Sequence, residues 1–567
     1  MESFWTGTVA NVRGSGVRPA SLSGLFAVPL MVAIMLGTTS VGAAPVLAQS
    51  VPAAAASPPG TGLAWGDNAD SQLGDGTTTN SSTPVAVDLP ADTTITAIAA
   101  GQGHSLAVTS GGTVLAWGAN SSGQLGDGTT TPSSTPVAVD LPADTTITAI
   151  AAGDRHSLAL TSTGTVLAWG HSLTGQLGDG TTTNSSTPVA VDLPAGTTIT
   201  AVAAGNAHSL ALTSTGAMLA WGANSSGQLG DGTTTPSSTP IAVDLPAGTT
   251  ITAIAASSSS HSLAVTSTGT MLAWGANFTG QLGNGTTTPS STPVAVDLPA
   301  DTTITAIAAG QGHSLALTST GAMLAWGGNG SGQLGDGTTT TSNTPIAVDL
   351  PADTTITAVA AGAGHSLALT STGTILAWGY NASGQLGDGT NSNSSTPVAV
   401  DLPADNTTTA VTGGSFHSLA IVPSAPTSTT TLQVSPPNPT PDQPVTLTAT
   451  ATCTGSTPTG TVTFLDGTTV LGTEPLSGSP TATATLTVTH LAPGTHHIQA
   501  RYNGDSNCPA STSNSTTVTV PEPTVPKPTI PVTGTSLPTI LTAGILLTLT
   551  GTALTLATRR RRPTRRA

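Results

Sequence analysis

The sequence contains few charged and few aromatic residues, and this shortage limits the kinds of protein it can encode. Only 7% of the 567 residues are charged and only 3% are aromatic, whereas charged residues make up about 25% of an ordinary soluble domain. Glutamate occurs three times and lysine once, so residues that favour exposed helix are nearly absent, while threonine, valine, glycine and proline are abundant. This composition excludes an ordinary helical protein and predicts an all-β fold.

Basic residues are almost confined to the two ends of the chain. Eight of the eleven lysines and arginines lie within the first 18 or the last nine residues, which leaves Arg155, Arg501 and Lys527 between them. A surface that binds nucleic acid needs clustered cations that displace the counterions of the phosphates. The net charge of −16, together with this distribution, excludes a nucleic-acid partner.

The first 48 residues have the order of a secretory signal peptide. Arg13 and Arg18 precede the apolar run 25–36, and small residues with Val-Leu-Ala follow at 46–48. The apolar run is too short for a membrane span, which needs about 20 residues. We therefore predict cleavage after Ala48 and export of the remaining chain.

The other end of the chain combines a predicted membrane span with a basic tail. Residues 537–558 carry no charge and are long enough to cross a bilayer. The tail at 559–567 follows at once, and the positive-inside rule leaves it in the cytoplasm and everything before the span outside. The span therefore predicts a membrane-anchored protein whose bulk is extracellular.

A pentapeptide just before the span extends this prediction. Its residues are Ile530, Pro531, Val532, Thr533 and Gly534. Pentapeptide, span and basic tail in this order resemble the LPxTG sorting signal of Gram-positive surface proteins, with Ile530 in the place of the usual leucine. The resemblance implies that a sortase cuts between Thr533 and Gly534 and joins Thr533 to peptidoglycan. A plain single-span anchor is the alternative.

The chain repeats itself between residues 61 and 422 with a period of 52 residues, which is once 53. One tryptophan and one histidine mark every copy. The tryptophans are Trp65, Trp117, Trp169, Trp221, Trp274, Trp326 and Trp378. The histidines are His104, His156, His208, His261, His313, His365 and His417. A repeat of this length indicates one supersecondary unit per copy, packed against its neighbours.

Four short runs in each copy are predicted strands. In the first full copy they span 84–89, 95–101, 104–109 and 113–118, and apolar residues alternate along the first run, as in a strand with one buried face. Four strands per copy predict one blade of a β-propeller. The chain enters with the fourth run of a blade, at 62–66, and leaves after the first three. We therefore expect a seven-bladed ring whose last blade is completed by a single N-terminal strand.

The repeated pattern His-Ser-Leu-Ala-Leu, followed by Trp-Gly-x-Asn-x-x-Gly-Gln-Leu-Gly-x-Gly, resembles the repeat of the regulator of chromosome condensation family. The resemblance covers residues 61–422 and implies a seven-bladed propeller that serves as a platform for protein interactions. The best-known member of this family is a nuclear exchange factor for a small GTPase that also docks on nucleosomes. The signal peptide and the scarcity of cations argue against both activities here. A regulator of the exchange-factor type is kept as an alternative.

The recurring polar residues are expected to be structural. Each histidine should form a hydrogen bond within its own blade, because buried polar groups normally find partners, and seven equivalent ring positions should lie too far apart to converge on a metal. The tryptophans are expected in the blade core. Each Gly-Asp-Gly-Thr loop offers one carboxylate, too few for calcium, and Asn284 replaces the aspartate in one copy. These loops are therefore predicted to be turns.

Catalytic patterns are not recognisable in the sequence. No nucleophile, base and orienting acid form a set, and no glycine-rich loop leads into a helix that would cradle phosphate. We therefore predict that the protein is not an enzyme and uses neither a cofactor nor a metal. An exported hydrolase with its site in the central channel is the alternative.

Departures from the repeat are the better guide to a binding site, because a function present once should not be encoded seven times. The residue before each histidine and the residue after each Trp-Gly vary between copies, and equivalent turns of a propeller lie on one face. The candidate contact residues are Arg155, His171, Tyr380 and Phe416. Neutral drift in exposed turns is the alternative.

A second module follows the repeats. Residues 430–520 contain six or seven alternating runs with turn signals between them, which predicts an antiparallel sandwich. The segment resembles the bacterial immunoglobulin-like repeats of surface proteins, which implies a spacer or adhesion module. Cys453 and Cys508 form a disulfide or are both free, and the disulfide is favoured in an exported chain. His496 and His497 are adjacent in a strand and should face opposite ways.

Residues 521–533 form a proline-rich, semi-rigid stalk in this interpretation. The sequence as a whole thus predicts a cell-surface protein, anchored in the wall or the membrane, that binds an unidentified protein or glycan through its propeller.

Overall fold

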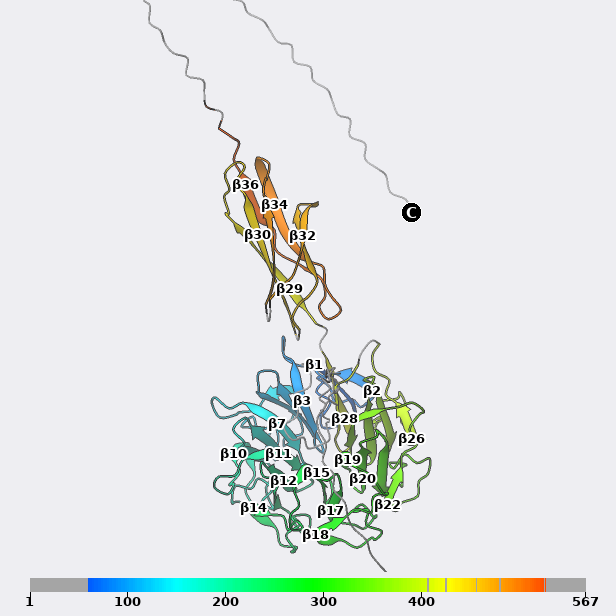
Figure 1. Cartoon of the computed structure of the whole chain (residues 1–567). Coiled ribbons are helices and arrows are strands. Elements are labelled where there is room, and N and C mark those ends of the chain that lie inside the picture. The colour runs from blue at the N-terminus through cyan, green and yellow to red at the C-terminus, as the bar shows by residue number, and fades with distance from the viewer. Residues whose placement is uncertain are drawn as a thin grey trace, which may run out of the picture. The chain divides into compact units, whose positions relative to one another are not determined.

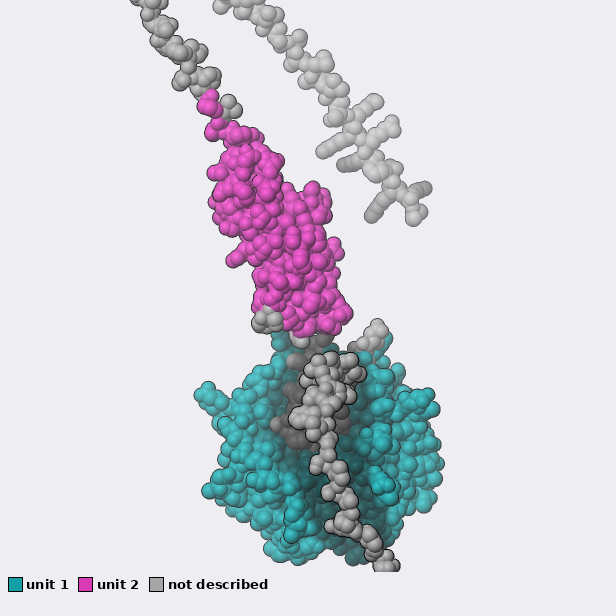
Figure 2. Space-filling model, viewed as in Figure 1, with its two compact units in different colours: residues 1–425 teal, residues 426–567 magenta. Residues whose placement is uncertain are grey.

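The computed structural model describes residues 60–404, 407–423, 426–454, 456–478, 481–524 and 526. The chain divides into two compact units, residues 1–425 and 426–567 (Figure 2). All of the secondary-structure elements described are strands, so the all-β prediction is confirmed. Within these residues no helix is long and apolar enough to span a membrane. The predicted signal peptide, sorting motif, membrane span and basic tail lie outside the described residues.

Strands β1 to β28 make up the first unit (Figure 1). Their bounds are β1 (Gly60–Gly66), β2 (Ser81–Ala86), β3 (Ile95–Ala100), β4 (His104–Thr109), β5 (Val114–Gly118), β6 (Ser133–Ala138), β7 (Ile147–Ala152), β8 (His156–Thr161), β9 (Val166–Gly170), β10 (Ser185–Ala190), β11 (Ile199–Ala204), β12 (His208–Thr213), β13 (Met218–Gly222), β14 (Ser237–Ala242), β15 (Ile251–Ala256), β16 (His261–Thr266), β17 (Met271–Gly275), β18 (Ser290–Ala295), β19 (Ile304–Ala309), β20 (His313–Thr318), β21 (Met323–Gly327), β22 (Ser342–Ala347), β23 (Ile356–Ala361), β24 (His365–Thr370), β25 (Ile375–Gly379), β26 (Ser394–Ala399), β27 (Ala410–Gly413) and β28 (His417–Pro423).

These strands pair in antiparallel groups of four. Five groups are separate sheets, and two more are joined into one eight-stranded sheet by a single pairing between Gly60 and Ile95. In six groups the strand that begins with histidine and the strand that contains tryptophan are fully buried, as in β4 and β5; in the remaining group only Thr61 of β1 and Pro423 of β28 are not buried. The outermost strand, as in β2, is half-buried and contains a proline, which protects an open sheet edge from pairing with another chain.

The group that joins the two ends of the unit consists of β27, β28, β1 and β2. Two strands of this group therefore come from each end of the unit. The expectation that three C-terminal strands and one N-terminal strand complete the last blade is wrong. The run at 84–89 was placed at the start of a blade, but β2 pairs with β1, with Leu63 opposite Ala86. Alternation along this run shows which side chains are buried, and it does not show which neighbouring strand the backbone pairs with.

Core packing joins each group to the next. Trp274 and Leu272 lie in one hydrophobic cluster with Leu210 and Leu229 of the preceding group, and Trp274 is fully buried. The other tryptophans are fully buried as well, which confirms that they form the core. Because the apolar faces of one repeat are covered only by its neighbours, a repeat cannot bury its core alone.

The histidines connect the groups in a closed circuit of hydrogen bonds. Each Nε2 lies 2.9–3.1 Å from the serine Oγ of the next group, and the last bond returns to the first group. The pairs are His104–Ser157, His156–Ser209, His208–Ser262, His261–Ser314, His313–Ser366, His365–Ser418 and His417–Ser105. The prediction of a bond within the histidine's own blade is therefore wrong, because the partner is 53 or 54 residues away, or 312 at the closure.

The serine hydroxyl fixes the protonation of the histidine. Ser105 Oγ donates to the main-chain oxygen of Gln72 at 2.8 Å, and Trp117 Nε1 donates to the same oxygen at 2.9 Å. Since the hydroxyl proton is used there, Ser105 accepts the bond from His417, whose Nε2 therefore carries a proton. Nδ1 of each of the seven histidines is buried and has no partner. The circuit of hydrogen bonds between the strand groups is thus formed by neutral imidazoles.

The Gly-Asp-Gly loops are turns, as predicted. Asp231 Oδ1 accepts bonds from Asn224 Nδ2 and the main-chain N–H of Thr233. Burial alone would raise the pKa of Asp231, but these hydrogen bonds outweigh it and lower that pKa. Asn284 Oδ1 accepts the equivalent bonds from Asn277 and Thr286, so the turn needs an oxygen acceptor and not a charge.

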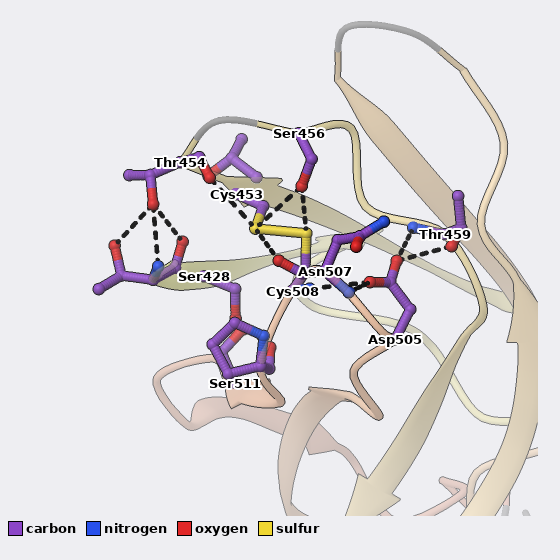
Figure 3. Close-up of a disulfide and its surroundings, with 12 residues drawn as sticks. Ser428, Cys453, Thr454, Ser456, Thr459, Asp505, Asn507, Cys508 and Ser511 are labelled. Carbon is purple, nitrogen blue, oxygen red and sulfur yellow. Dashed lines mark hydrogen bonds between the residues drawn. A yellow bond between two sulfur atoms is a disulfide. The ribbon is translucent and has the colours of Figure 1, made fainter. Parts of the chain in front are cut away.

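The second unit is a sandwich of two sheets. Its strands are β29 (Ser428–Ser435), β30 (Val445–Cys453), β31 (Thr461–Asp466), β32 (Thr469–Pro475), β33 (Ala482–Val488), β34 (Gly494–Tyr502), β35 (Ser511–Thr512) and β36 (Thr516–Val520). One sheet has the order β29-β30-β33, and the other has the order β32-β31-β34-β35 with β36 also paired to β34. Phe464 and Tyr502 are fully buried between them. The Cys453–Cys508 disulfide joins the end of β30 to the loop after β34 (Figure 3).

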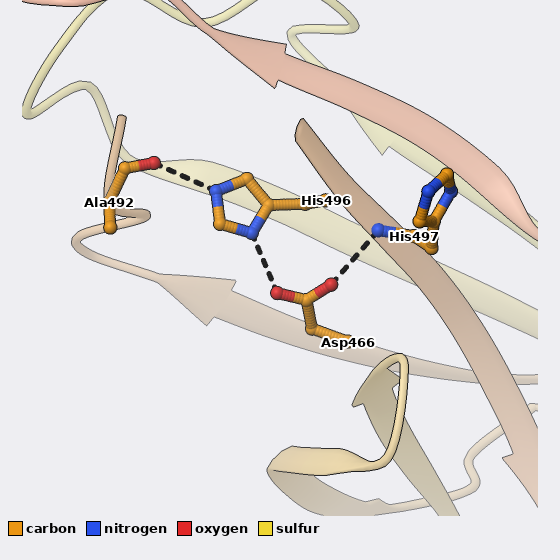
Figure 4. Close-up of polar contacts among 4 residues, drawn as sticks. All are labelled: Asp466, Ala492, His496 and His497. Atoms are coloured by element: carbon orange, nitrogen blue, oxygen red, sulfur yellow. Dashed lines mark hydrogen bonds and ion pairs between the residues drawn. The ribbon is translucent and has the colours of Figure 1, made fainter. Parts of the chain in front are cut away.

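His496 of this unit has a hydrogen-bond acceptor at each ring nitrogen (Figure 4). Nδ1 lies 2.6 Å from Asp466 Oδ2, and Nε2 lies 2.8 Å from the main-chain oxygen of Ala492. Only the doubly protonated ring can donate to both, and the bond to Asp466 raises the pKa of His496. The side chain of His497 points away from this cluster, although its main-chain N–H donates to Asp466 Oδ1 (Figure 4).

We predict that acid unfolds the first unit cooperatively. Burial lowers the pKa of each ring histidine to about 3 or 4, from 6.5. Their stabilising contribution is therefore complete above pH 6.5 and is lost as the pH falls toward the folded-state values. One such group changes the unfolding free energy by about 1.4 kcal/mol per pH unit, so seven reach about 10 kcal/mol per pH unit.

Calorimetric scans from about pH 7 to about pH 5 test this. The melting temperature of the first unit should fall steeply. The second unit is the internal control, because the raised pKa of His496 gives a contribution that is present at acid pH and lost as the pH rises. A transition of the first unit that stays constant over this range would contradict the prediction.

Candidate binding face

One end of the first unit carries both sets of variable turns. His104 at the start of β4 is paired with Gly118 at the end of β5, so the turn before the histidine and the turn after Trp-Gly lie together. In every group the main-chain N–H after Trp-Gly donates to the oxygen of the residue before the histidine, as Ala119 does to Gly103. We call this end the histidine end. The opposite end carries turns such as Thr109–Thr113 and is called the threonine end.

The four candidate contact residues form two pairs at the histidine end. His171 N–H donates to Arg155 O at 2.9 Å, and the rings of Tyr380 and Phe416 meet edge to face with their centroids 6.1 Å apart. The first pair belongs to the β7–β10 group. The second pair spans two groups, because Tyr380 follows β25 and Phe416 precedes β28. The structure therefore brings the candidates together in pairs and not as a set of four.

The aromatic pair lies beside a carboxylate. The N–H of Asp67 donates to Phe416 O at 2.9 Å, and Asp67 Oδ2 accepts a bond from Gln72 Nε2 at 2.8 Å. Asp67 occupies the same repeat position as His171 and Tyr380, directly after Trp-Gly. The rule that selected those two residues applies equally to Asp67, which the sequence analysis overlooked.

A buried amide next to this pair lacks a partner. Gln385 is fully buried, and its Nε2 has no hydrogen-bond acceptor. In two other repeats the equivalent glutamine reaches the side chain after Trp-Gly: Gln72 bonds Asp67, and Gln176 bonds His171. Tyr380 stands at that position before Gln385. An unpaired buried donor costs about 1–3 kcal/mol.

The other pair has a different character. Arg155 is exposed, and His171 Nδ1 accepts a bond from Gln176 Nε2 at 2.8 Å. Burial, together with the positive charge of Arg155, lowers the pKa of His171. Burial raises the pKa of the neighbouring Asp154 to about 6 against the opposing effect of Arg155, and Asn206 Nδ2 donates to this carboxyl at 2.9 Å.

A central hollow of about 20 Å³ opens among the strand ends of the histidine end. Alanines and glycines line most of it, and its polar side chains are those of Asp154, Ser258 and Ser415. The described residues that line it include no histidine, cysteine or lysine. A volume of this size accommodates about one water molecule, which suits a small polar group better than a substrate.

The large exposed apolar side chains of the described first unit lie at the same end, in three different groups. Leu173 and Phe278 are 68% and 74% exposed, and Phe416 is 40% exposed. Leu173 and Phe278 occupy equivalent positions, and the threonines that follow them donate to main-chain oxygens at the histidine end of the next group. Among the described residues of this unit, no other large hydrophobic side chain is exposed to this degree. Leu173 is not among the predicted contact residues, because it lies three residues after Trp-Gly and not at the position that directly follows it.

Two family models match the chain. Residues 61–420 match the RCC1-like domain, and residues 430–521 match the bacterial Ig-like domain of group 3. These matches confirm a propeller of this type followed by an immunoglobulin-like module.

Curated relatives agree with the first match. The ultraviolet-B receptor UVR8 of Arabidopsis thaliana is 32% identical over 325 residues, which cover 57% of this chain and 74% of the receptor. The human E3 ubiquitin-protein ligase HERC2 is 31% identical over 381 residues, which cover 67% of this chain and only 8% of the ligase.

Solved structures show the same fold. Human WBSCR16 is 24% identical with a TM-score of 0.58, and the match covers 64% of this chain and 99% of that one. Prp20p of Saccharomyces cerevisiae, described with its binding to Gsp1p and histones, is 25% identical with a TM-score of 0.58, covering 65% of this chain and 92% of that one.

The repeat that holds Arg155 and His171 lacks an asparagine that forms structural hydrogen bonds in the other repeats. Introducing that asparagine should stabilise the first unit. Six repeats place asparagine two residues after Trp-Gly; Asn277, for example, donates to Asn284 and Thr286 and accepts from Leu282 N–H. Ser172 replaces it and accepts one long bond from Leu177 N–H at 3.4 Å. We predict that Ser172→Asn raises the unfolding free energy by about 1 kcal/mol.

Denaturant unfolding measures this change, and Asn277→Ser is the matched control, which should lower the unfolding free energy by about 1 kcal/mol or more. If both substitutions changed the unfolding free energy in the same direction, or if Ser172→Asn lowered it, the asparagine contacts would not be the reason for the difference between repeats.

Proposed function

Because this chain belongs to the RCC1-like domain family, we propose that it binds a protein partner through the histidine end of its propeller and is displayed outside the cell. The observation that carries the proposal is that Leu173, Phe278 and Phe416, the large exposed apolar side chains of the described first unit, all lie at the histidine end, in three different groups. Exposed apolar side chains that all lie at one end of a domain are available for contact with a protein partner. The propeller binds in this proposal and does not catalyse.

We assign the seven four-stranded groups to seven blades of one closed ring. The circuit of histidine–serine bonds, which returns from His417 to Ser105, supports this assignment. The pairing of β1 with β28 supports it as well, because it joins the two ends of the unit. A closed ring provides a rigid scaffold on which the turns of the histidine end keep fixed positions.

The described chain enters and leaves the first unit at the threonine end. Gly60 pairs with Pro423 where the chain enters and leaves the unit, while Gly66 pairs with His417 at the opposite end of the same strands. Both connections to the rest of the chain therefore depart from the threonine end. A face turned away from its own connections suits a displayed binding module.

Display outside the cell is supported by the sequence of both termini. A signal peptide at 1–48, an immunoglobulin-like module, a proline-rich stalk and the Ile530–Gly534 motif before a predicted span follow the order of a wall-anchored protein. The Cys453–Cys508 disulfide fits an oxidising compartment. Sortase and peptidoglycan are the partners that this anchoring requires.

The family also favours a second candidate, a regulator of the exchange-factor type. Prp20p, described with its binding to Gsp1p and histones, is the relevant relative. Such a regulator acts on an intracellular GTPase, so it would be found inside the cell with Met1 retained. The location of the protein therefore separates the two candidates.

Mass spectrometry of the protein released from cell walls by a muramidase tests the display. We predict a C-terminal peptide that ends at Thr533 and carries a wall fragment, because cleavage and transfer occur at that residue. Thr533→Ala should leave the protein in the membrane fraction with its C-terminus intact to Ala567. Thr529→Ala, outside the motif, is the control and should be processed normally.

Two results would count against this proposal. A native protein that is found in the membrane with Ala567 retained would remove the sortase step and leave a plain anchor. Recovery from the cytosol with Met1 present would favour the exchange-factor candidate.

A further inference from the structure

Building on the proposed binding function, we infer that the partner presents a lysine or arginine side chain and that Tyr380, Phe416 and Asp67 at the histidine end receive it. Four independent features of the described residues support this inference: the charge of the unit, the placement of two unusual carboxylates, the aromatic pair and the unpaired amide of Gln385.

The charge of the propeller selects a cationic partner. Residues 61–422 contain 21 aspartates, no glutamate and one cation, Arg155, which gives a formal charge of −20. A field of this sign attracts basic partners and repels acidic ones. Because salt screens exposed charges beyond about 8 Å, the attraction is decided by the carboxylates that lie at the contact itself.

Most of these carboxylates recur around the ring and therefore do not define a single site. The recurring positions are the Gly-Asp-Gly loops, the Val-Asp-Leu segments and the Pro-Ala-Asp turns. Asp67 and Asp70 have no counterpart in the other copies, where alanine, glycine, histidine, tyrosine, serine or threonine stands at the equivalent positions. Both lie in the turn that follows β1, at the histidine end.

The two carboxylates differ in the hydrogen bonds that they accept from the described residues. Asp67 accepts one bond from Gln72. The Asp70 carboxylate has no hydrogen-bond partner among the described residues; its Oδ2 faces Gly103, where a Cβ atom would lie only 2.6 Å away. The absence of a side chain at Gly103 thus makes room for the Asp70 carboxylate itself.

The aromatic pair supplies the second element that recognises a cation. A cationic side chain is attracted to the face of an aromatic ring, and Phe416, which meets Tyr380 edge to face, is 40% exposed. The main-chain bond from Asp67 N–H to Phe416 O makes Asp67 the cross-strand neighbour of Phe416. Aromatic faces and carboxylates together favour a lysine or arginine over a purely apolar or an acidic side chain.

The unpaired amide of Gln385 indicates that the site is completed by the partner. Its Nε2 is a fully buried donor without an acceptor, next to Tyr380 in its own repeat. A main-chain carbonyl of the partner, flanking the basic side chain, would provide that acceptor once the Tyr380 ring turns aside. Arg155 does not compete for this site, because it lies in the β7–β8 turn of a different group.

A peptide selection with the full chain, purified in detergent, tests the inference independently of wall anchoring. The probe is a library of short random peptides, selected at low salt. The selected peptides should be enriched in lysine or arginine, and replacement of that residue by norleucine should weaken binding by about tenfold or more. High salt should weaken binding as well.

Variants locate the site. Phe416→Ala and Asp67→Ala should each weaken binding of the selected peptide by about tenfold, and both substitutions introduce a residue that other repeats already hold, at Ala207 and Ala119. Asp144→Gly is the matched control: it removes one carboxylate at the threonine end, where Gly196 and Gly248 occupy the equivalent position. It should leave peptide affinity unchanged.

The outcomes separate the inference from the function on which it rests. Selected peptides without basic enrichment, or binding that Phe416→Ala and Asp67→Ala weaken no more than Asp144→Gly does, would overturn the inference and leave a binding propeller. A selection that yields no peptide would overturn the inference and the proposed binding function together.

Discussion

The closed circuit of histidine–serine hydrogen bonds is the interaction on which the rest of the propeller depends. Each serine hydroxyl bridges the preceding group twice, by accepting from its histidine and by donating to the main-chain oxygen of its glutamine. The neighbouring tryptophan donates to that same oxygen. Four polar groups from two adjacent strand groups are thus satisfied at one buried point, which makes the register between neighbours specific where apolar packing alone would tolerate sliding.

This arrangement explains why the repeats are so uniform and where they can differ. The histidine, serine, tryptophan and glutamine of one group must fit those of the next, so a substitution at any of them affects two groups. The turns at the histidine end share one main-chain bond in every group, such as Ala119 N–H to Gly103 O, while the side chains directly before histidine and directly after Trp-Gly differ between repeats. Diversity is therefore concentrated where a partner can reach it, and Ser172 shows that one repeat has lost structural contacts next to Arg155 and His171.

Periodicity predicted much of this architecture. The spacing of tryptophan and histidine located the strands and the buried positions, and the two variable turns were correctly placed at the same end. The strand partners were not predictable in the same way: the alternation along 84–89 fits either neighbour, so the two-plus-two closure was missed. Bonds between groups, such as His104 to Ser157, join repeats that look identical in sequence, so nothing distinguishes an internal partner from an external one. Gln385 is conspicuous only because its neighbours leave it without an acceptor.

The excess of carboxylates follows the same division between scaffold and surface. A charge of −20 on one domain is self-repelling, and the Gly-Asp-Gly loops offset part of that repulsion, because Asp231 accepts from Asn224 and Thr233 and has a lowered pKa in return. Asn284 shows that even there the charge is dispensable to the turn. The exposed Asp70 carboxylate has no such hydrogen bond among the described residues. It therefore supports no turn, and in our proposal it adds to the negative field that attracts a basic partner.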